Sequence, residues 1–366
     1  MKAAVLLKNN TPLVVEDLDL ADPKHGEVFV RYVASGVCHT DLSMMQALRP
    51  IPLPMILGHE GAGIVEAVGP GVTRTKPGDH FIANPEPFCG RCKFCASGRS
   101  NICLMRGTPK NLFNMLDNTY RVHRNGEPVH TLLQIGTFSH QAVVPEECVI
   151  PIRKDAPLDK VCLVGCGAMS GVGSVFNRAK VEPGSSVAVF GCGGVGLCVV
   201  QGATVAGAGR IIAVDILKEK LDMAEHFGAT HVIDASREEP VARIQQLTDD
   251  LGVDYSFEAV GTAKTVEDAF ASVHRGGTCV MIGLPPVGTK ITLDVDVIRP
   301  ERVLMASGFG GARQSIDLPM LVDLYMSGKL KLDELISRTL PLEEVNTALG
   351  ELQHGRVARS VLKYDA

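Results

Sequence analysis

Four cysteines stand at short, regular intervals early in the chain. Cys89, Cys92, Cys95 and Cys103 follow a C-x2-C-x2-C-x7-C pattern. Gaps of two residues let neighbouring thiolates turn onto one ion, and a closed structural zinc site takes four such ligands at about 2.3 Å. Disulfides are the alternative, but thiols at ligand spacing are typical of a reducing compartment. The pattern therefore predicts a structural zinc lobe over residues 89–103, which leaves no room for a substrate.

A second group of metal-binding residue types lies on either side of this lobe. Cys38, His59 and Cys166 each stand beside small residues, at positions expected for loop ends. Two thiolates and one imidazole leave the fourth position of a zinc ion open, as in catalytic zinc sites. Taken alone, each residue would more often be structural, and Cys166 has the weakest support from spacing. Asp41 and Glu60 could orient His59 or modulate the field of the metal, or could be solvated loop acids.

Downstream of both groups, the glycine-rich stretch 191–196 has the form G-x-G-x-x-G. An apolar strand over 186–190 leads into it, a helix is expected after it, and an acidic residue ends the next strand, which is the context of a dinucleotide-binding turn. A carboxylate at that place binds ribose hydroxyls and repels a 2′-phosphate, so NAD is favoured over NADP. The alternative is a plain glycine turn followed by a solvated acid. The residues expected to bind the dinucleotide are Gly191, Gly193, Gly194, Val195, Gly196, Asp215 and Lys220, the last of which could equally be a surface helix lysine.

Length and composition restrict the class of protein. A chain of 366 residues is long for one core, so two domains are expected. A net charge of −5 and the lack of a Lys/Arg block argue against a nucleic-acid partner. We find neither a signal-peptide core nor an apolar run long enough to span a membrane, so we expect a cytoplasmic protein with no membrane partner.

The spacing of apolar residues changes along the chain. Up to about residue 165, short β-rich segments alternate with Pro/Gly turns, which favours a barrel-like all-β domain. From about 168, apolar strands over 186–190, 210–215, 231–234, 255–258 and 279–283 alternate with helical stretches. Such strands imply a parallel sheet covered on both faces. Helices near 315–327 and 343–353 precede a last strand near 360–363. The predicted fold class is α/β, a Rossmann doubly wound parallel sheet joined to a β-rich domain.

Together, these motifs resemble the medium-chain, zinc-containing alcohol dehydrogenases over essentially the whole chain. The resemblance implies a GroES-like catalytic domain over 1–167 with the zinc lobe inside it, a Rossmann NAD-binding domain over 168–308, and a return to the catalytic domain over 309–366. It also implies NAD and two zinc ions per chain as cofactors, and a homodimer or homotetramer.

The resemblance further assigns roles to individual residues. Cys38, His59 and Cys166 fall on the catalytic zinc ligands and Glu60 on a nearby acid. Thr40 falls on the hydroxyl that hydrogen-bonds the alcohol, His39 on a basic position facing the pyrophosphate, and Arg359 on a C-terminal phosphate contact. The chain departs from the family at Ser43, where many members have a histidine that relays the proton. The relay beyond Thr40 must then use Ser43, water or His39.

The expected reaction is hydride transfer between a primary alcohol, aliphatic or aromatic, and NAD. Zinc lowers the pKa of a hydroxyl, and Thr40 then accepts the proton. With no Trp and 5% aromatic residues, the pocket is expected to be aliphatic, with the 104–138 segment as its cap. One alternative is oxidation of a thiol adduct of formaldehyde, with glutathione or mycothiol as the kind of thiol, because 165–171 resembles a branch with that activity. Against glutathione, no acidic residue lies between Ser43 and His59. A second alternative is a non-catalytic NAD-binding zinc protein.

Overall fold

The computed structural model describes residues 1–105, 112–354 and 358–365. The chain divides into two compact units. The first comprises Met1–Cys166, Arg313–Ser327 and Leu332–Ala366, and the second comprises Gly167–Ala312 and Gly328–Lys331. The return to the first unit thus starts at Arg313 rather than at 309, and four residues after α10 belong to the second unit.

The first unit contains a seven-stranded sheet in the order β11-β7-β6-β4-β19-β18, with β10 also paired to β4. Its central strand β4 is eleven residues long and pairs with β6, β10 and β19. Because β19 lies near the C-terminus, this pairing ties the end of the chain to its beginning. The strands are β4 (Glu27–Val37), β6 (Glu60–Val68), β7 (His80–Ala83), β10 (Gln141–Pro145), β11 (Val149–Ile152), β18 (Ile336–Leu340) and β19 (Arg359–Lys363).

A second sheet of the same unit has the order β2-β1-β5-β9-β8-β3. Its β8 and β9 form a hairpin inside the 104–138 segment, of which 106–111 lie outside the described residues, and the expected role of this segment as a cap stays a prediction. Fully buried Tyr32, Phe81 and Phe138 belong to the core of this unit. The strands are β1 (Lys2–Leu6), β2 (Val14–Asp17), β3 (Asp19–Leu20), β5 (Met55–Ile56), β8 (Val122–Arg124) and β9 (Glu127–Thr131).

Few helices accompany these sheets. The short α1 (His39–Met45) follows β4 directly, and its first residues are the ones for which chemistry is expected. Two helices of the return segment, α10 (Gln314–Met326) and α11 (Val345–Gln353), lie close to the expected positions and bury Leu318, Leu321 and Leu349 among others. The remaining ones are α2 (Lys93–Ala96) and α3 (Leu158–Val161).

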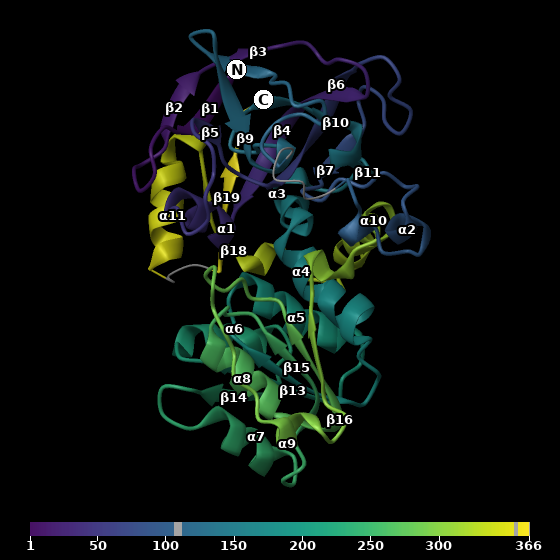
Figure 1. Ribbon diagram of the computed structural model, residues 1–366, viewed down its shortest axis with the longest axis vertical. Helices are drawn as coiled ribbons and strands as arrows, with labels where there is room; N and C mark the ends of the chain where they lie inside the picture. The colour runs from purple at the N-terminus through teal and green to yellow at the C-terminus, as the bar shows by residue number, and fades with distance from the viewer. Residues whose placement is uncertain (106–111, 355–357, 366) are drawn as a thin grey trace. The chain divides into compact units, whose positions relative to one another are not determined.

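The second unit is built on a six-stranded parallel sheet in the order β14-β13-β12-β15-β16-β17. In chain order this is 3-2-1-4-5-6, the Rossmann arrangement that binds a dinucleotide where the strand order reverses beside β12. The predicted fold class is thereby confirmed. Figure 1 shows helices alternating with these strands. The strands are β12 (Ser186–Phe190), β13 (Arg210–Asp215), β14 (His231–Asp234), β15 (Val253–Glu258), β16 (Val273–Met281) and β17 (Val303–Ala306).

Six helices belong to this unit, among the residues that are described: α4 (Gly167–Gly173), α5 (Gly194–Val205), α6 (Lys218–His226), α7 (Pro240–Leu247), α8 (Ala263–Ala271) and α9 (Val295–Ile298). A π-helical stretch over Ser174–Ala179 continues α4. In the described part of the chain, no single helix is both long and apolar enough to cross a membrane. The consecutive helical stretches Leu158–Gly165 and Gly167–Ala179 are long and apolar enough only when they are counted as one helix, but the chain bends between them. Most of their apolar side chains are buried.

Three glycines of the turn between β12 and α5 differ in whether the fold requires them. Gly191 has a φ of +91°, which favours glycine, and Gly196 packs so tightly that a Cβ there would lie 1.8 Å from the Gly191 carbonyl oxygen. Gly193, by contrast, has a negative φ, and a Cβ there would meet nothing within 4 Å. Two glycines are therefore required by the fold, while Gly193 leaves open space above the helix N-terminus.

These contacts predict opposite outcomes for two alanine variants. Gly196→Ala must push β12 and α5 apart, so we expect it to lower the free energy of unfolding by roughly 2–3 kcal/mol. Gly193→Ala should leave the melting temperature unchanged and weaken dinucleotide binding, because its methyl group fills space that a pyrophosphate would occupy. Thermal unfolding and NADH titration of both variants test this. Equal melting temperatures for the two variants would contradict it.

Candidate metal and nucleotide sites

One cluster of metal-binding side chains lies within the first unit. Ligand atoms of Cys38, His59, Glu60 and Cys166 all lie within 4.8 Å of one another. Cys38 caps α1 at the end of β4, His59 directly precedes β6, and Cys166 ends a 3-10 helix. The structure thus brings together the three predicted ligands from separate segments. It also adds the Glu60 carboxylate at ligand distance.

Asp41 holds two segments of this cluster in place through hydrogen bonds. Its side chain is fully buried, and its Oδ2 accepts a hydrogen bond from the Cys38 N–H at 3.1 Å. Its Oδ1 lies 3.0 Å from both the Gly58 N–H and the His59 Nδ1. The Nε2 of His59 is buried and has no hydrogen-bond partner. An imidazole held at Nδ1 by a carboxylate, with Nε2 left over, is the arrangement of a zinc-binding histidine.

Protons are shared between the two thiols of the cluster. A hydrogen bond from Cys166, together with nearby Arg359, lowers the pKa of Cys38 despite burial, while the neighbouring Cys38 and burial raise the pKa of Cys166. Burial opposes a charge on His59, but the Asp41 carboxylate and Cys38 raise its pKa well above the usual value. Zinc needs thiolates and a neutral imidazole, so binding a metal here must release protons.

Glu60 and Arg359 form an ion pair beside the thiols. Their side chains are almost completely buried, and Arg359 Nη1 lies 3.3 Å from Glu60 Oε1. Burial raises the pKa of Glu60 to about 7, although Arg359 opposes this. Gly36 makes room for the acid, because a Cβ there would lie 2.2 Å from Glu60 Oε2. The Arg359 guanidinium thus lies against the metal cluster, and its expected phosphate contact stays a prediction.

The remaining candidates for proton transfer lie on α1. Thr40 and Ser43 are both half-buried and one helical turn apart, so their hydroxyls share a face of the helix. His39 is exposed at the first position of the helix. These positions are compatible with the roles expected for Thr40 and His39, which remain predictions.

The four cysteines of the lobe also converge. Ligand atoms of Cys89, Cys92, Cys95 and Cys103 lie within 4.8 Å of one another, and the Cys92–Cys95 sulfurs are 3.6 Å apart. Backbone N–H groups point at these sulfurs and lower the pKa of Cys92 to about 6. All eleven cysteines of the chain are free thiols. The cluster therefore has the donor set of a closed zinc site, and the disulfide alternative is wrong.

The nucleotide site of the second unit is formed at the carboxyl ends of its strands. Asp215 ends β13, and its Oδ2 accepts a hydrogen bond from the Cys192 N–H of the glycine turn at 2.8 Å. No side chain caps α5, so its first N–H groups can bind a phosphate. Lys220 is half-buried in the first turn of α6. These residues fit NAD.

Sequence reasoning missed two apolar residues beside this turn. Val260 follows β15 and is 50% exposed, and its Cγ2 would lie 2.6 Å from a Cβ on Gly191. Ile216 follows β13 and is 64% exposed. Because β13 and β15 flank β12, these aliphatic side chains stand on either side of the nucleotide crevice. What marks these two residues is their exposure next to a strand end. A single sequence does not report exposure, so it gave no signal for them.

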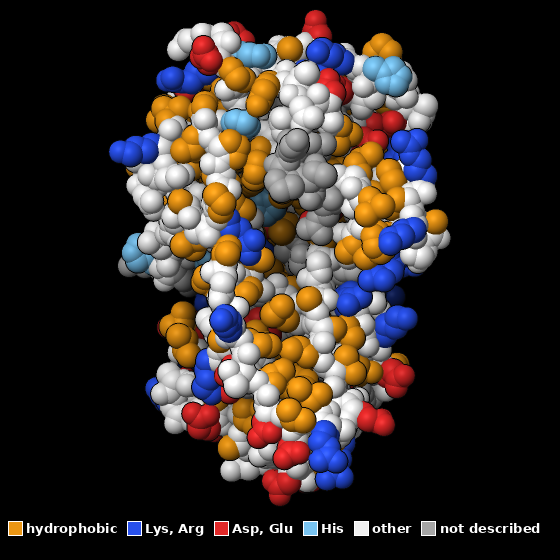
Figure 2. All heavy atoms as spheres, viewed as in Figure 1, with side chains coloured by type: hydrophobic (Ala, Val, Ile, Leu, Met, Phe, Trp, Pro, Cys, Tyr) orange, Lys and Arg blue, Asp and Glu red, His pale blue; other side chains and the backbone are white. Residues whose placement is uncertain are grey.

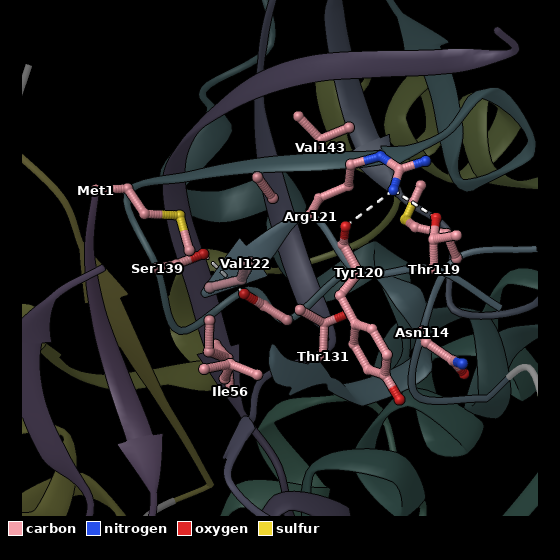
Figure 3. A pocket seen from close by; sticks show the side chains of 14 residues that line it. Met1, Ile56, Asn114, Thr119, Tyr120, Arg121, Val122, Thr131, Ser139 and Val143 are labelled. Carbon is pink, nitrogen blue, oxygen red and sulfur yellow. Dashed lines mark hydrogen bonds between the residues drawn. The ribbon is translucent and has the colours of Figure 1, made fainter. Parts of the chain in front are cut away.

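A small cavity elsewhere in the first unit is unrelated to the metal cluster. Met1, Ile56, Tyr120, Arg121 and Thr131 are among the side chains that line it (Figure 3). Arg121 donates to the Tyr120 carbonyl at 2.9 Å and pairs with buried Glu27. The cavity has room for about one water molecule, which is far too little for a substrate.

Comparison with known proteins agrees with this geometry. Residues 24–154 match the alcohol dehydrogenase GroES-like domain, and residues 194–325 match the zinc-binding dehydrogenase domain. The chain is 43% identical to an S-(hydroxymethyl)glutathione dehydrogenase from Paracoccus denitrificans, over 99% of both chains. It is 42% identical to a class-3 alcohol dehydrogenase from Dictyostelium discoideum, over 99% of this chain and 97% of the other.

A solved structure supports the same assignment. The benzyl alcohol dehydrogenase of Acinetobacter calcoaceticus superposes with a TM-score of 0.93 at 32% identity, covering 100% of this chain and 99% of the other. Members of this family use NAD and zinc to interconvert alcohols and aldehydes, and the two donor clusters and the glycine turn fit these cofactors. The chain belongs to the zinc-containing medium-chain alcohol dehydrogenases.

Proposed function

We propose that this enzyme oxidises the S-hydroxymethyl adduct that formaldehyde forms with a low-molecular-weight thiol. One observation carries the proposal, which is the 43% identity to an S-(hydroxymethyl)glutathione dehydrogenase over nearly the full length of both chains. This reverses the order of the expectations from sequence, which placed a simple primary alcohol first. The non-catalytic alternative falls, because the chain belongs to an enzyme family and carries all three zinc ligands.

The adduct suits the site chemically. Its reacting group is a primary hydroxyl on the carbon next to sulfur. When bound, zinc would supply the Lewis acidity that lowers the pKa of such a hydroxyl, and NAD would be the hydride acceptor. Cys38, His59 and Cys166 would hold the zinc, and Asp41 would keep the His59 ring in place.

Residues of α1 would then move the proton. The Thr40 hydroxyl accepts a proton from the substrate and donates its own proton to Ser43, one turn further along the same helix. Ser43 then passes a proton towards solvent. A hydroxyl can accept one proton and donate another, so this path leaves no charge on Thr40 or Ser43. Water completes the path to solvent, where many family members use a histidine.

Arg49 supports a substrate that carries carboxylates. It is the only charged residue between Ser43 and His59, in the segment that connects α1 to the strand before His59. Its side chain is half-buried, and none of the described residues pairs with it. Thiols such as glutathione bear carboxylates, so the absence of an acidic residue in this segment argues only against an ammonium contact here. A guanidinium binds a carboxylate with two parallel hydrogen bonds.

A second candidate substrate is an uncharged aromatic or aliphatic primary alcohol. The structural likeness to benzyl alcohol dehydrogenase favours it, at a TM-score of 0.93. Such a substrate would not need Arg49.

The roles of the metal ligands and of Thr40 can be separated by zinc content. Cys38→Ser should reduce two zinc ions per chain to one and abolish turnover. Thr40→Ala should keep both ions and lower kcat by about 100-fold, the usual scale for loss of a proton-transfer group. Cys162→Ser, which removes another fully buried thiol of the same unit, is the control and should keep both ions. Full turnover in Cys38→Ser would contradict the assignment.

Substrate preference is tested by NADH absorbance with formaldehyde alone, with formaldehyde plus glutathione, and with benzyl alcohol. We expect turnover of formaldehyde to require the thiol. Arg49→Gln should raise KM for the adduct about tenfold, an effect of ~1.4 kcal/mol, and leave KM for benzyl alcohol unchanged. Thiol-independent activity with benzyl alcohol as the better substrate would decide for the second candidate.

We also propose that copies of the chain associate through the second unit. Its edge strand β17 pairs only with β16 among the described residues, which leaves one edge open. Large apolar side chains cluster in the sequence just before and at this strand, and Figure 2 shows exposed hydrophobic side chains on this unit. An open apolar edge associates readily with a second copy about a twofold axis. The exposed residues are Leu284, Val287, Ile291, Val295, Ile298 and Val303.

Light scattering tests this interface. Val295 is 67% exposed, so Val295→Asp should not disturb the fold, yet it places a charge in the interface. We expect the wild-type mass to be at least twice the chain mass of 39.0 kDa, and the variant to approach the mass of one chain. Val14→Asp, an exposed valine of the first unit, is the control. An unchanged mass for Val295→Asp would place the interface elsewhere.

The cytoplasm remains the proposed location. Two clusters of free thiols at metal-ligand distance support it, since such thiols persist in a reducing compartment.

A further inference from the structure

A buried carboxylate stands at the point where the order of strands reverses in the second unit. Glu258 is the last residue of β15, paired in register with Phe190 of β12 on one side and Met281 of β16 on the other. Its side chain has no exposed surface. No cation pairs with it among the described residues. A buried charge without a counter-ion costs stability, so its presence calls for a function.

One oxygen of this carboxylate holds the loop that follows β15. Oε1 accepts hydrogen bonds from the N–H groups of Val260 at 2.8 Å and Gly261 at 2.6 Å. It also accepts one from the Thr265 hydroxyl at 2.8 Å, in the first turn of α8. Hydrogen bonds to an ionised acceptor are roughly twice as strong as neutral ones. The side chain of Val260, which lies on the glycine turn, is thereby held in place.

The same residue also contacts the loop that follows β16. The Glu258 carbonyl accepts hydrogen bonds from the N–H groups of Ile282 at 2.8 Å and Gly283 at 2.9 Å. The other carboxylate oxygen, Oε2, is buried without a hydrogen-bond partner, and a Cβ on Gly283 would lie 2.6 Å from it. Glu258 therefore connects two loops at this edge of the sheet, residues 259–261 and residues 282–284, and the first of them contacts the glycine turn through Val260.

The position of these loops indicates which half of NAD they meet. Asp215 at the end of β13 is placed for the adenosine ribose, and the N-terminus of α5 for the pyrophosphate. A dinucleotide lies across the crevice, so its nicotinamide half lies over the ends of β15 and β16. We propose that Glu258 is a positioning residue for the nicotinamide half of NAD, holding loops 259–261 and 282–284 in their binding conformation.

This role separates cofactor affinity from stability. Glu258→Gln preserves the shape of the side chain but replaces charged hydrogen bonds with weaker neutral ones. The loops then lose order that binding must restore, which weakens affinity. The fold loses those stronger bonds but is relieved of an uncompensated buried charge, so the melting temperature of the cofactor-free chain should stay within about 2 °C of wild type.

NADH binding, followed by fluorescence on the zinc-loaded protein, tests the proposal together with thermal unfolding. Glu258→Gln should raise Kd for NADH about tenfold, equivalent to ~1.4 kcal/mol. Glu258→Asp keeps the charge but withdraws the carboxylate from Val260 and Gly261, and should weaken binding to a similar degree. Asp254→Asn, a change at the opposite end of the same strand, is the matched control and should leave Kd unchanged.

Three results would overturn the proposal. One is an unchanged Kd in Glu258→Gln. Another is wild-type affinity in Glu258→Asp, which would show that charge alone matters. The third is a Tm loss in Glu258→Gln as large as that of a core truncation, which would make the residue merely structural. Should neither Glu258 variant fold, Thr265→Val removes one of the three donors and should raise Kd about threefold, with Thr265→Ser restoring binding. Unchanged affinity in Thr265→Val would then count against the proposal.

Discussion

The contact on which the site depends is the one between buried Asp41 and the two ligand segments of the metal cluster. A single carboxylate accepts hydrogen bonds from the backbone of Cys38 and Gly58 and holds the His59 ring at Nδ1. These contacts fix the relative positions of the Cys38 thiol and the His59 imidazole, which are separated along the chain. They leave His59 Nε2 among the other ligand atoms of the cluster. Because Asp41 also caps the first turn of α1, the same contact sets the position of the helix that carries Thr40.

Charge balance shapes the rest of the cluster. Two thiols, Glu60 and Asp41 bring four acidic groups together in a buried site, and among the described residues Arg359 is the permanent cation that pairs with Glu60. In the absence of metal, protons on Cys166 and His59 make up the difference. A zinc dication replaces these protons, so the site is designed for an ion and is costly without one.

Features that are encoded within a few consecutive residues were predictable from the sequence. The strands 186–190 and 210–215 coincide with β12 and β13, because each contains an apolar run that is buried on both faces. The strand 231–234 coincides with β14, although only Ile233 of it is fully buried. The cysteine lobe and the glycine turn were predictable for the same reason, since their geometry is encoded within a few residues.

Features that depend on distant parts of the chain were not predictable. Arg359 meets Glu60 only because β19 pairs with β4, which itself pairs with β6. The edge strand β17 is a run of only four apolar residues, too short for its pattern to distinguish a strand from a helix, and the β8–β9 hairpin is stabilised by neighbours far away in sequence. From sequence, Glu258 was an ordinary strand end, because its importance lies in the two loops that it connects.

Two donor clusters per chain are expected to bind metal, one of them closed and the other open to substrate. Diffraction from crystals of the zinc-loaded protein, collected on both sides of the zinc absorption edge, tests this most directly. We expect two anomalous peaks per chain, one among the four lobe cysteines and one within bonding distance of Cys38, His59 and Cys166. A single peak in the lobe, with His59 Nε2 bonded to protein alone, would contradict the account.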